Sequence, residues 1–309
     1  MKNEAVQLKL KNIISDSPMT SYQVIVVAIC FILNFNDGID VSVVSFTGSE
    51  IATEWSLSKS QLGYIFSAGL VGMTVGSFLL APMGDKIGRN RIFLISLFLI
   101  SLGMVSIFFS EAYWQLLVCR LITGLGIGGI LPNLATMVSE FSNQRHRDFN
   151  VGFVQAGWPL GSILTGFFAA WAVPEFGWRF TYLVAGLISF AMLIAVYFLL
   201  PESLVFLVKN QPKNAKQRIN FILDKIRQPL LEEMPGKPEF QITPSIRSLF
   251  TPELKSSTLL LWLAIFFGFL TLYTLLSWVP SIAKDAGMPF EMATYLGAML
   301  NAGSFSGVV

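Results

Sequence analysis

Three charged residues stand inside segments that are otherwise apolar enough to cross a membrane. Asp37 and Asp40 lie in the stretch NFNDGIDVSVVSF, and Arg120 begins the stretch RLITGLGIGG. An ionised side chain at the centre of a membrane helix costs roughly 2.5–3.5 kcal/mol on insertion scales, so such residues are candidates for function. Carboxylates that share a site with an arginine are suited to binding a proton next to a bound anion.

The spacing of these residues predicts that they meet. Asp37 and Asp40 are at positions i and i+3, so they share one helix face. Asp40 should lie roughly 9 Å, and Asp37 roughly 14 Å, below the end of a span that closes near residue 46, and Arg120 roughly 10 Å from the start of an antiparallel span. The three side chains can therefore pair if their helices are neighbours. Two structural alternatives stay open: a simple ion pair, or a helix break at Asp37-Gly38.

Arg120 is followed by glycines on the same helix face. Gly124 and Gly128 stand at i+4 and i+8, and small residues let membrane helices approach closely. We expect these glycines to form a helix-packing surface and Arg120 to face protein or a cavity, away from lipid.

The composition excludes most soluble classes of protein. Apolar residues make up 53% of the 309 residues and charged residues only 13%, which indicates a membrane protein. Cys30 and Cys119 fall in apolar segments and His146 is the single histidine, so we expect no disulfide framework, metal site or cofactor. No nucleophile–base set or nucleotide loop is present, so neither an enzyme nor a nucleic-acid partner is expected.

Eight apolar segments are long enough to cross a bilayer core of about 30 Å. They are residues 22–46, 61–83, 91–110, 113–137, 150–173, 179–200, 257–283 and 291–309. We therefore predict an N-terminal six-helix bundle over 1–200, a cytoplasmic linker over 201–256 and the first two helices of a second bundle over 257–309. The eighth span reaches Val309 without a polar flank, which favours a fragment or a truncated product.

Basic residues alternate between the two sides of the predicted spans. One side carries far more of them than the other, and the positive-inside rule places that side in the cytoplasm together with the N-terminus. The cytoplasmic residues are Lys2, Lys9, Lys11, Lys86, Arg89, Arg91, Arg145, Arg147 and nine in the linker (Lys209 to Lys255), whereas the opposite side has Lys59, Arg179 and Lys284. We expect a multi-pass protein of the inner (plasma) membrane.

The loop between the second and third spans resembles a known signature. The stretch GDKIGRNRIF, from residue 84, resembles the cytoplasmic G-x-x-x-D-R/K-x-G-R-R/K motif of the major facilitator superfamily, although Ala81 and Asn90 depart from it. The resemblance implies an all-α polytopic fold of two six-helix bundles, here the first bundle plus two helices of the second. It also implies a cytoplasmic gate, formed by Gly84, Asp85, Gly88, Arg89 and Arg91.

Further stretches resemble one branch of that superfamily. NDGIDVSVVSF is similar to the D-G-x-D segment of the aromatic acid:proton symporters, and RLITGLGIGGILPN and SEFSNQRHR are similar to their fourth helix and following loop. LPESLVFL resembles the P-E-S motif shared with sugar porters, with Leu204 in place of the commoner proline. This resemblance implies that Asp37 and Asp40 serve transport and proton coupling and that Arg120 attracts a substrate carboxylate.

Five further residues are weaker candidates for binding the substrate. In this fold the first, fourth and seventh helices line the central cavity, where Tyr273 can stack on an aromatic ring. Trp and Tyr near span ends also serve as interface anchors, and a membrane asparagine also bonds neighbouring helices. The candidates are Gln155 and Trp158 in the fifth span, Tyr273 and Trp278 in the seventh, and Asn301 in the eighth.

These observations together predict a proton-coupled symporter that imports an aromatic or related small carboxylate by alternating access. Its expected partners are this carboxylate, protons and the lipid bilayer, and we expect a monomer. One alternative is a sugar or polyol porter, which takes a neutral substrate and leaves Arg120 a structural role. Another is a truncated, non-transporting remnant or sensor. The sequence leaves open which carboxylate is carried and how many protons accompany it.

Overall fold

The computed structural model describes residues 17–234 and 246–308, and the regular elements of this part of the chain are helices. The predicted cytoplasmic residues Lys2, Lys9, Lys11 and Lys237 and the terminal Val309 lie outside the described residues. The elements are α2 (Ser21–Glu54), α3 (Lys59–Leu79), η1 (Ala81–Met83), α4 (Gly84–Ile87), α5 (Arg89–Phe108), α6 (Tyr113–Phe141), α7 (Arg147–Gln155), α8 (Gly157–Phe176), α9 (Trp178–Leu199), α10 (Leu204–Asn210), α11 (Ala215–Lys225), η2 (Ile246–Phe250), α12 (Lys255–Asp285) and α13 (Phe290–Val308).

Seven helical segments of the described chain are long and apolar enough to span a membrane, which confirms the prediction of an all-α polytopic membrane protein. They correspond to the first seven predicted spans. The eighth predicted span is a helix, α13, but it is not one of the seven. Its glycine, serine, threonine and asparagine residues lower the mean hydropathy of an otherwise apolar segment.

The first span is longer than predicted. Thr20 caps the start of α2 in a capping box with Gln23, so its first N–H groups are satisfied. The helix does not end near residue 46 but continues to Glu54, because the acidic residues of its last turns have partners on other helices. Glu50 pairs with Lys284 and Glu54 pairs with Arg179.

The fifth predicted span consists of two helices, α7 and α8, that meet at Ala156. Proline has no N–H, so Pro159 cannot donate to the carbonyl of Gln155 four residues earlier. The amide of Asn34 on α2 donates to that carbonyl at 3.4 Å and to the carbonyl of Val154 at 2.7 Å. The break is therefore satisfied by a neighbouring helix, as buried backbone in a membrane requires.

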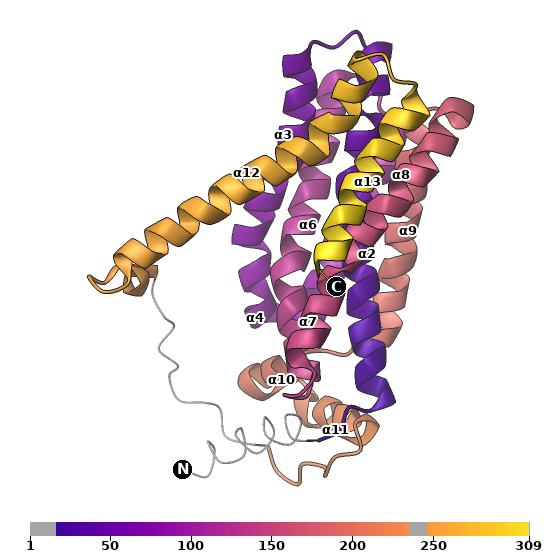
Figure 1. Ribbon diagram of the computed structural model, residues 1–309. Coiled ribbons are helices and arrows are strands. Elements are labelled where there is room, and N and C mark those ends of the chain that lie inside the picture. The colour runs from indigo at the N-terminus through magenta and orange to yellow at the C-terminus, as the bar shows by residue number, and fades with distance from the viewer. Residues whose placement is uncertain (1–16, 235–245, 309) are drawn as a thin grey trace.

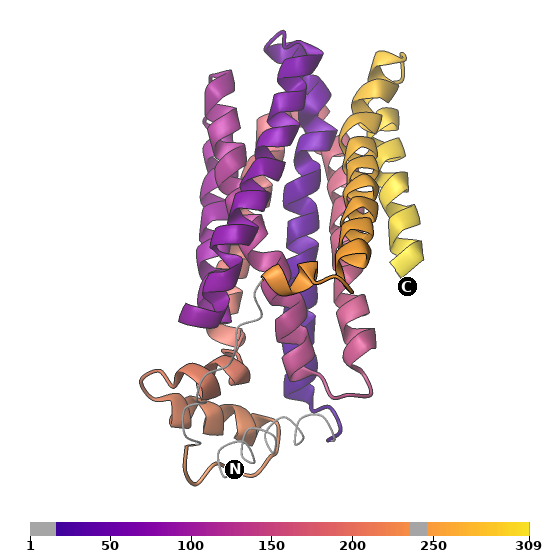
Figure 2. The ribbon, with the colours of Figure 1, turned by 90° about the vertical axis from the view of Figure 1, so that its left-hand side faces the viewer.

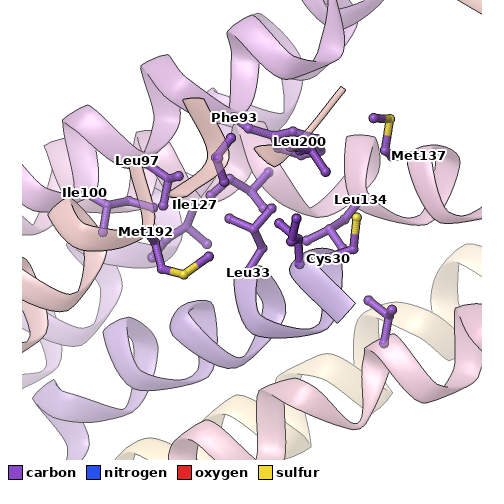
Figure 3. Packing of buried hydrophobic residues seen from close by; sticks show 14 of the residues in the cluster. Cys30, Leu33, Phe93, Leu97, Ile100, Ile127, Leu134, Met137, Met192 and Leu200 are labelled. Carbon is purple, nitrogen blue, oxygen red and sulfur yellow. The ribbon is translucent and has the colours of Figure 1, made fainter. Parts of the chain in front are cut away.

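The long helices form an upright bundle, and α10 and α11 lie across one end of it (Figure 1). We call this the linker end and the opposite end the far end. Figure 2 shows the same arrangement from the side. The apolar core runs between α2, α5, α6 and α9, with Leu33, Leu97, Ile100 and Ile127 close together (Figure 3), and it continues into α10 and α11 through Leu207 and Leu223.

Glycines bring pairs of helices into close contact. A Cβ atom on Gly124 or Gly128 of α6 would overlap the carbonyl oxygen of Gly69 or Met73 on α3. A Cβ atom on Gly38 of α2 would likewise overlap the backbone of α8. The two glycines that follow Arg120 thus lie where α6 packs directly on α3.

Helix α12 contacts the bundle only over its C-terminal part. Its buried residues are Pro280, Ser281 and Ala283, near the far end, whereas Trp262 and Phe266 near its start are exposed. Figure 1 shows the first half of α12 diverging from the bundle toward the linker end, while α13 runs back beside α8.

Candidate functional site

Arg120 is enclosed by three helices midway along the bundle. It projects from α6, and its side chain is only 4% exposed. Its Nη1 donates to the main-chain carbonyl of Asp40 at 3.3 Å, and Nη2 lies over Gly69 of α3, where a Cβ atom would come within 2.8 Å. The buried Nε–H has no hydrogen-bond partner among the described residues. One donor of a buried guanidinium is therefore free for another acceptor.

Of the two acids, Asp40 contacts Arg120 in the described structure, and it does so through its main chain. We expected Arg120 to pair with a carboxylate, but its closest acceptor is the backbone oxygen of Asp40. The reason is that the Asp40 side chain points to another helix, α9. Asn36 Nδ2 donates to one carboxylate oxygen of Asp40 at 2.9 Å, and the Ser189 hydroxyl lies 3.3 Å from both oxygens.

Asp37 is the less satisfied of the two acids. It is 1% exposed, and neither of its carboxylate oxygens has a hydrogen-bond partner in the part of the chain that the structure describes. It interacts electrostatically with Asp40 on its own helix and with Tyr273 on α12. A buried carboxyl group in this position is available to a proton or to a ligand, because nothing in the described protein occupies its lone pairs.

A small cavity lies where α2, α3, α6 and α12 meet. It has a volume of about 20 Å³, which is room for about one water molecule. Its wall includes Arg120, the aromatic rings of Phe66 and Tyr273, and the hydroxyl-bearing Ser277. The structure thus brings Arg120 and Tyr273, two predicted substrate-binding residues, to one cavity formed by helices of both predicted bundles.

The remaining predicted substrate-binding residues lie apart from this cavity. Trp278 packs edge-on against Phe66, with the ring centroids 5.3 Å apart, and lines a second pocket nearer the far end. Gln155 is exposed at the end of α7, and the backbone of Trp158 packs on Gly38. Asn301 donates to a carbonyl of its own helix, and its buried Oδ1 has no partner among the described residues.

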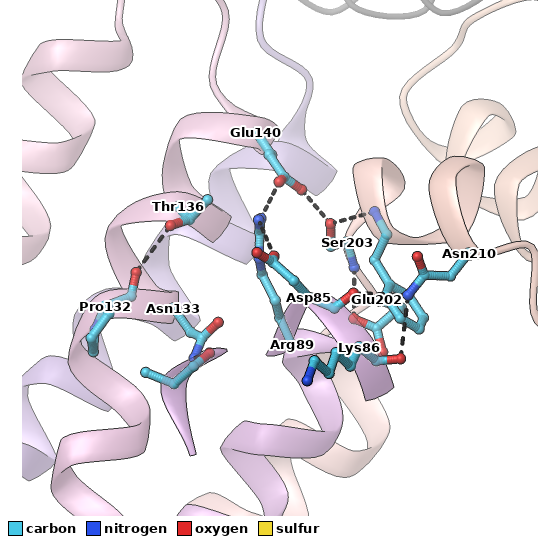
Figure 4. Close-up of polar contacts among 12 residues, drawn as sticks. Asp85, Lys86, Arg89, Pro132, Asn133, Thr136, Glu140, Glu202, Ser203 and Asn210 are labelled. Carbon is cyan, nitrogen blue, oxygen red and sulfur yellow. Dashed lines mark hydrogen bonds and ion pairs between the residues drawn. The ribbon is translucent and has the colours of Figure 1, made fainter. Parts of the chain in front are cut away.

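The predicted cytoplasmic gate forms a polar cluster at the linker end (Figure 4). Arg89 forms ion pairs with Asp85, at 3.3 Å, and with Glu140 of α6. The second oxygen of Glu140 accepts the hydroxyl of Ser203, which also caps α10. Arg89 and Glu140 are nearly buried, so this cluster joins α5, α6 and the linker within one unit.

Glycine is required at two positions of the motif. Gly88 has a φ of +110°, which disfavours residues with a side chain, and a Cβ atom there would overlap the Glu202 carboxylate. Glu202 accepts the backbone N–H of Asn90 at 3.1 Å, and a Cβ atom on Gly84 would overlap the side chain of Asn133. Arg91 is exposed and has no ion-pair partner in the described chain.

Sequence reasoning missed the role of the P-E-S segment and the ion pairs at the far end. Glu202 and Ser203 belong to LPESLVFL: Glu202 accepts the backbone N–H of Asn90 in the motif, and Ser203 donates to Glu140, the ion-pair partner of Arg89. At the far end, Lys284 and Asp285 of α12 pair with Glu50 of α2 and Lys59 of α3. Lys59, Lys284 and Asp285 border a pocket of about 230 Å³. The basic residues of these pairs were predicted only as charges of the outer loops.

Comparison with known proteins supports one family. The model of the Major Facilitator Superfamily matches residues 30–309. The gallate transporter of Pseudomonas putida is 31% identical over 98% of this chain and 68% of its own length. The 4-hydroxybenzoate transporter PcaK of Acinetobacter baylyi is 31% identical over 96% of this chain and 66% of its own. The chain thus spans about two thirds of these relatives.

Solved structures share the fold. The xylose transporter XylE from E. coli, in a partially occluded inward open conformation, has a TM-score of 0.71 and covers 93% of this chain at 18% identity, with 71% of XylE covered.

The benzoate transport protein of Acinetobacter baylyi is a further relative by sequence, 26% identical over 98% of this chain and 66% of its own length. The chain belongs to the major facilitator superfamily and, within it, to the family of transporters for aromatic acids that includes these relatives.

Proposed function

We propose that this chain carries an aromatic carboxylate across the inner membrane together with protons. The observation on which the proposal rests is a pair of buried groups without partners among the described residues: the Nε–H of Arg120, whose Nη1 binds the main chain of Asp40, and the carboxyl group of Asp37, one helical turn from Asp40. A positive group with a free donor binds an anion, and a carboxyl group without partners can accept a proton. The names of the relatives, which are transporters for gallate, 4-hydroxybenzoate and benzoate, support the substrate class.

The residues that line the cavity have the chemistry that an aromatic carboxylate needs, and the cavity, which has a volume of about 20 Å³ in this state, must widen to admit one. The guanidinium of Arg120 is planar and forms parallel hydrogen bonds to a carboxylate, which a lysine cannot do. Phe66 and Tyr273 provide aromatic walls for a ring, and stacked or edge-on ring pairs are favourable. A neutral sugar would leave the free donor of Arg120 without an acceptor of opposite charge.

Proton coupling removes an electrical barrier to uptake. Moving one negative charge inward against an inside-negative potential of 100 mV is opposed by roughly 2.3 kcal/mol. If one proton enters with each carboxylate, the net charge moved is zero and this barrier is absent. Arg120 contacts Asp40 through its main chain, and Asp37 lies one helical turn from Asp40 on the same helix. We assign the coupling to these two carboxyl groups.

The proposed cycle is alternating access by a monomer whose N-terminus and linker end are cytoplasmic. The far end of α12 is joined to α2 and α3 by the Glu50–Lys284 and Lys59–Asp285 pairs, whereas its first half stands away from the bundle. We assign this arrangement to a state closed toward the outside. The units that move would be the six-helix bundle of residues 1–200 and the helices of residues 257–309, connected by the linker of residues 201–256.

Uptake measurements test this function. The chain is expressed in cells without their own aromatic acid uptake, and accumulation of labelled gallate, 4-hydroxybenzoate and benzoate is compared with that of xylose. We expect uptake of at least one acid, none of xylose, and loss of accumulation on adding a protonophore. Accumulation of the acid that is unchanged by the protonophore would contradict proton coupling.

Two variants test the assigned residues. Arg120→Lys keeps the charge but loses the planar donors, so we expect KM to rise roughly tenfold or more, as for the loss of a hydrogen bond to a charged group. Asp37→Asn should abolish accumulation. Arg179→Lys, at the far end and outside the cavity, is the matched control and should leave KM unchanged. An unchanged KM in Arg120→Lys would remove Arg120 from the substrate site.

A further inference from the structure

The two buried aspartates have different surroundings, and the difference points to two residues with no role assigned so far. Asp40 is fully buried and is bonded through its side chain to Asn36 on α2 and to Ser189 on α9. Asp37, one helical turn away, has no such partner in the described chain. Asn36 and Ser189 also bond each other, with Asn36 Nδ2 donating to the serine oxygen at 3.0 Å.

The hydroxyl of Ser189 has more acceptors than it can serve at once. It lies 3.3 Å from each oxygen of Asp40, 3.3 Å from the Asn36 carbonyl oxygen and 3.0 Å from the main-chain oxygen of Ala185. A hydroxyl has one hydrogen and two lone pairs. It can therefore donate to an ionised Asp40, or accept from a protonated Asp40 while its own hydrogen turns to Ala185.

The amide of Asn36 is compatible with both states as well. Its Nδ2 donates to the Asp40 oxygen Oδ2 at 2.9 Å, and that oxygen accepts a hydrogen bond whether or not the other oxygen carries a proton. The cluster of Asn36, Asp40 and Ser189 can thus gain and lose one proton by rotating a hydroxyl, without moving a helix. A buried carboxyl group that must change charge needs such partners, because an unpaired buried charge is strongly disfavoured.

We infer that Asn36 and Ser189 are positioning residues that make Asp40 the carrier of the coupled proton, beside the arginine that binds the substrate. Arg120 bonds the main chain of the same residue, Asp40, so the anion and proton sites are linked through one helix turn. The other charged or titratable groups that face this place are Asp37 on α2, Tyr182 on α9, which interacts with Arg120, and Tyr273 on α12. This inference rests on the proposed function.

Ser189→Ala tests the inference in two transport modes. Exchange of labelled for unlabelled substrate needs no net proton movement, whereas accumulation driven by a pH gradient does. We expect exchange to stay within about twofold of the parent and accumulation to fall roughly tenfold or more, the effect of a lost hydrogen bond to a charged group. Ser189→Thr keeps the hydroxyl and should restore accumulation.

A matched control separates this effect from a general loss of packing. Ser101 is also a buried serine whose hydroxyl bonds α9, at the carbonyl of Gly186, 2.9 Å away. Ser101→Ala should change neither mode. Equal loss of exchange and accumulation in Ser189→Ala, or normal accumulation in that variant, would overturn the inference.

A second measurement does not depend on transport. Infrared difference spectra of the purified chain in lipid follow the band of protonated carboxyl groups as the pH is changed. We expect Asp40→Asn to remove one band and Ser189→Ala to move its midpoint by about one pH unit or more. If the midpoint moves but no uptake occurs, the proposed function fails, whereas the role of Asn36 and Ser189 in positioning the proton of Asp40 stands. If uptake occurs and the midpoint does not move, the inference fails alone.

Discussion

Replacing Glu140 with glutamine removes one charge from the linker-end cluster while keeping the shape of the side chain. The partner, Arg89, has a side chain that is 9% exposed, and that of Glu140 is 12% exposed. Breaking a buried ion pair by removing one partner destabilises a protein by about 3–5 kcal/mol, because the other charge stays buried without compensation. Asp85 also pairs with Arg89 but is 69% exposed. In Glu140→Gln this exposed pair would therefore compensate the charge left on Arg89 by at most about 1 kcal/mol.

The expected loss of unfolding free energy in Glu140→Gln is therefore about 2–4 kcal/mol, the difference between these two effects. For a chain of this size that corresponds to a decrease in Tm of about 3–6 °C. Tryptophan fluorescence during thermal unfolding of the purified chain in detergent measures it. This assay does not depend on transport, so it tests the geometry of the cluster by itself.

Two comparisons make the prediction sharp. Asp85→Asn removes the exposed partner and should lower Tm by no more than about 2 °C. The double variant Arg89→Met, Glu140→Met removes both buried charges and should be more stable than Glu140→Gln alone, since no unpaired charge remains. A Glu140→Gln variant within about 2 °C of the parent, or a double variant less stable than the single one, would refute the reasoning.

Two further predictions concern the packing of α6 and the closure of the far end. Gly124→Ala should destabilise the chain by about 1–3 kcal/mol because its Cβ overlaps the backbone of Gly69. The control Gly152→Ala places its Cβ in open space and should be neutral or stabilising. Equal shifts of Tm in the two variants would contradict the close contact of α3 and α6. Glu50→Lys and Lys284→Glu should each separate the far ends of α2 and α12, and the double reversal should restore their spacing. Distances between spin labels on the far ends of α2 and α12 measure this. Unchanged distances in both single variants would show that the Glu50–Lys284 pair does not hold the far end closed.

The spans could be predicted from the sequence because the thickness of the bilayer sets the length of an apolar helix. The same argument predicted the wrong end for α2, since Glu50 and Glu54 look like loop residues until Lys284 and Arg179 are placed beside them. It also missed the break at Ala156, although Pro159 is a local signal for it.

The sequence identifies the candidate residues of the site but does not predict their geometry. Asp37, Asp40 and Arg120 stand out because charges are rare in spans, and this needs no knowledge of neighbours. The orientation of Asp40 depends on Ser189, which lies 149 residues away in the chain. An isolated serine in an apolar helix carries no signal of its own, so its contact with the carboxylate appears only when α2 and α9 are packed together.

The two kinds of ion pair in this chain differ in a way that suits the proposed cycle. The pair of Arg89 and Glu140 lies within the six-helix bundle and is nearly buried, so separating it is costly and the bundle should move as a unit. The Lys59–Asp285 pair joins the bundle to α12 and is more than half exposed, so it contributes roughly 0–1 kcal/mol. Helix α12 can therefore leave α3 at the far end at small cost. In the proposed cycle, the binding of carboxylate and proton at Arg120 and Asp40 would supply the energy for the change of access, since only a ligand with different affinities for the two states can shift their populations.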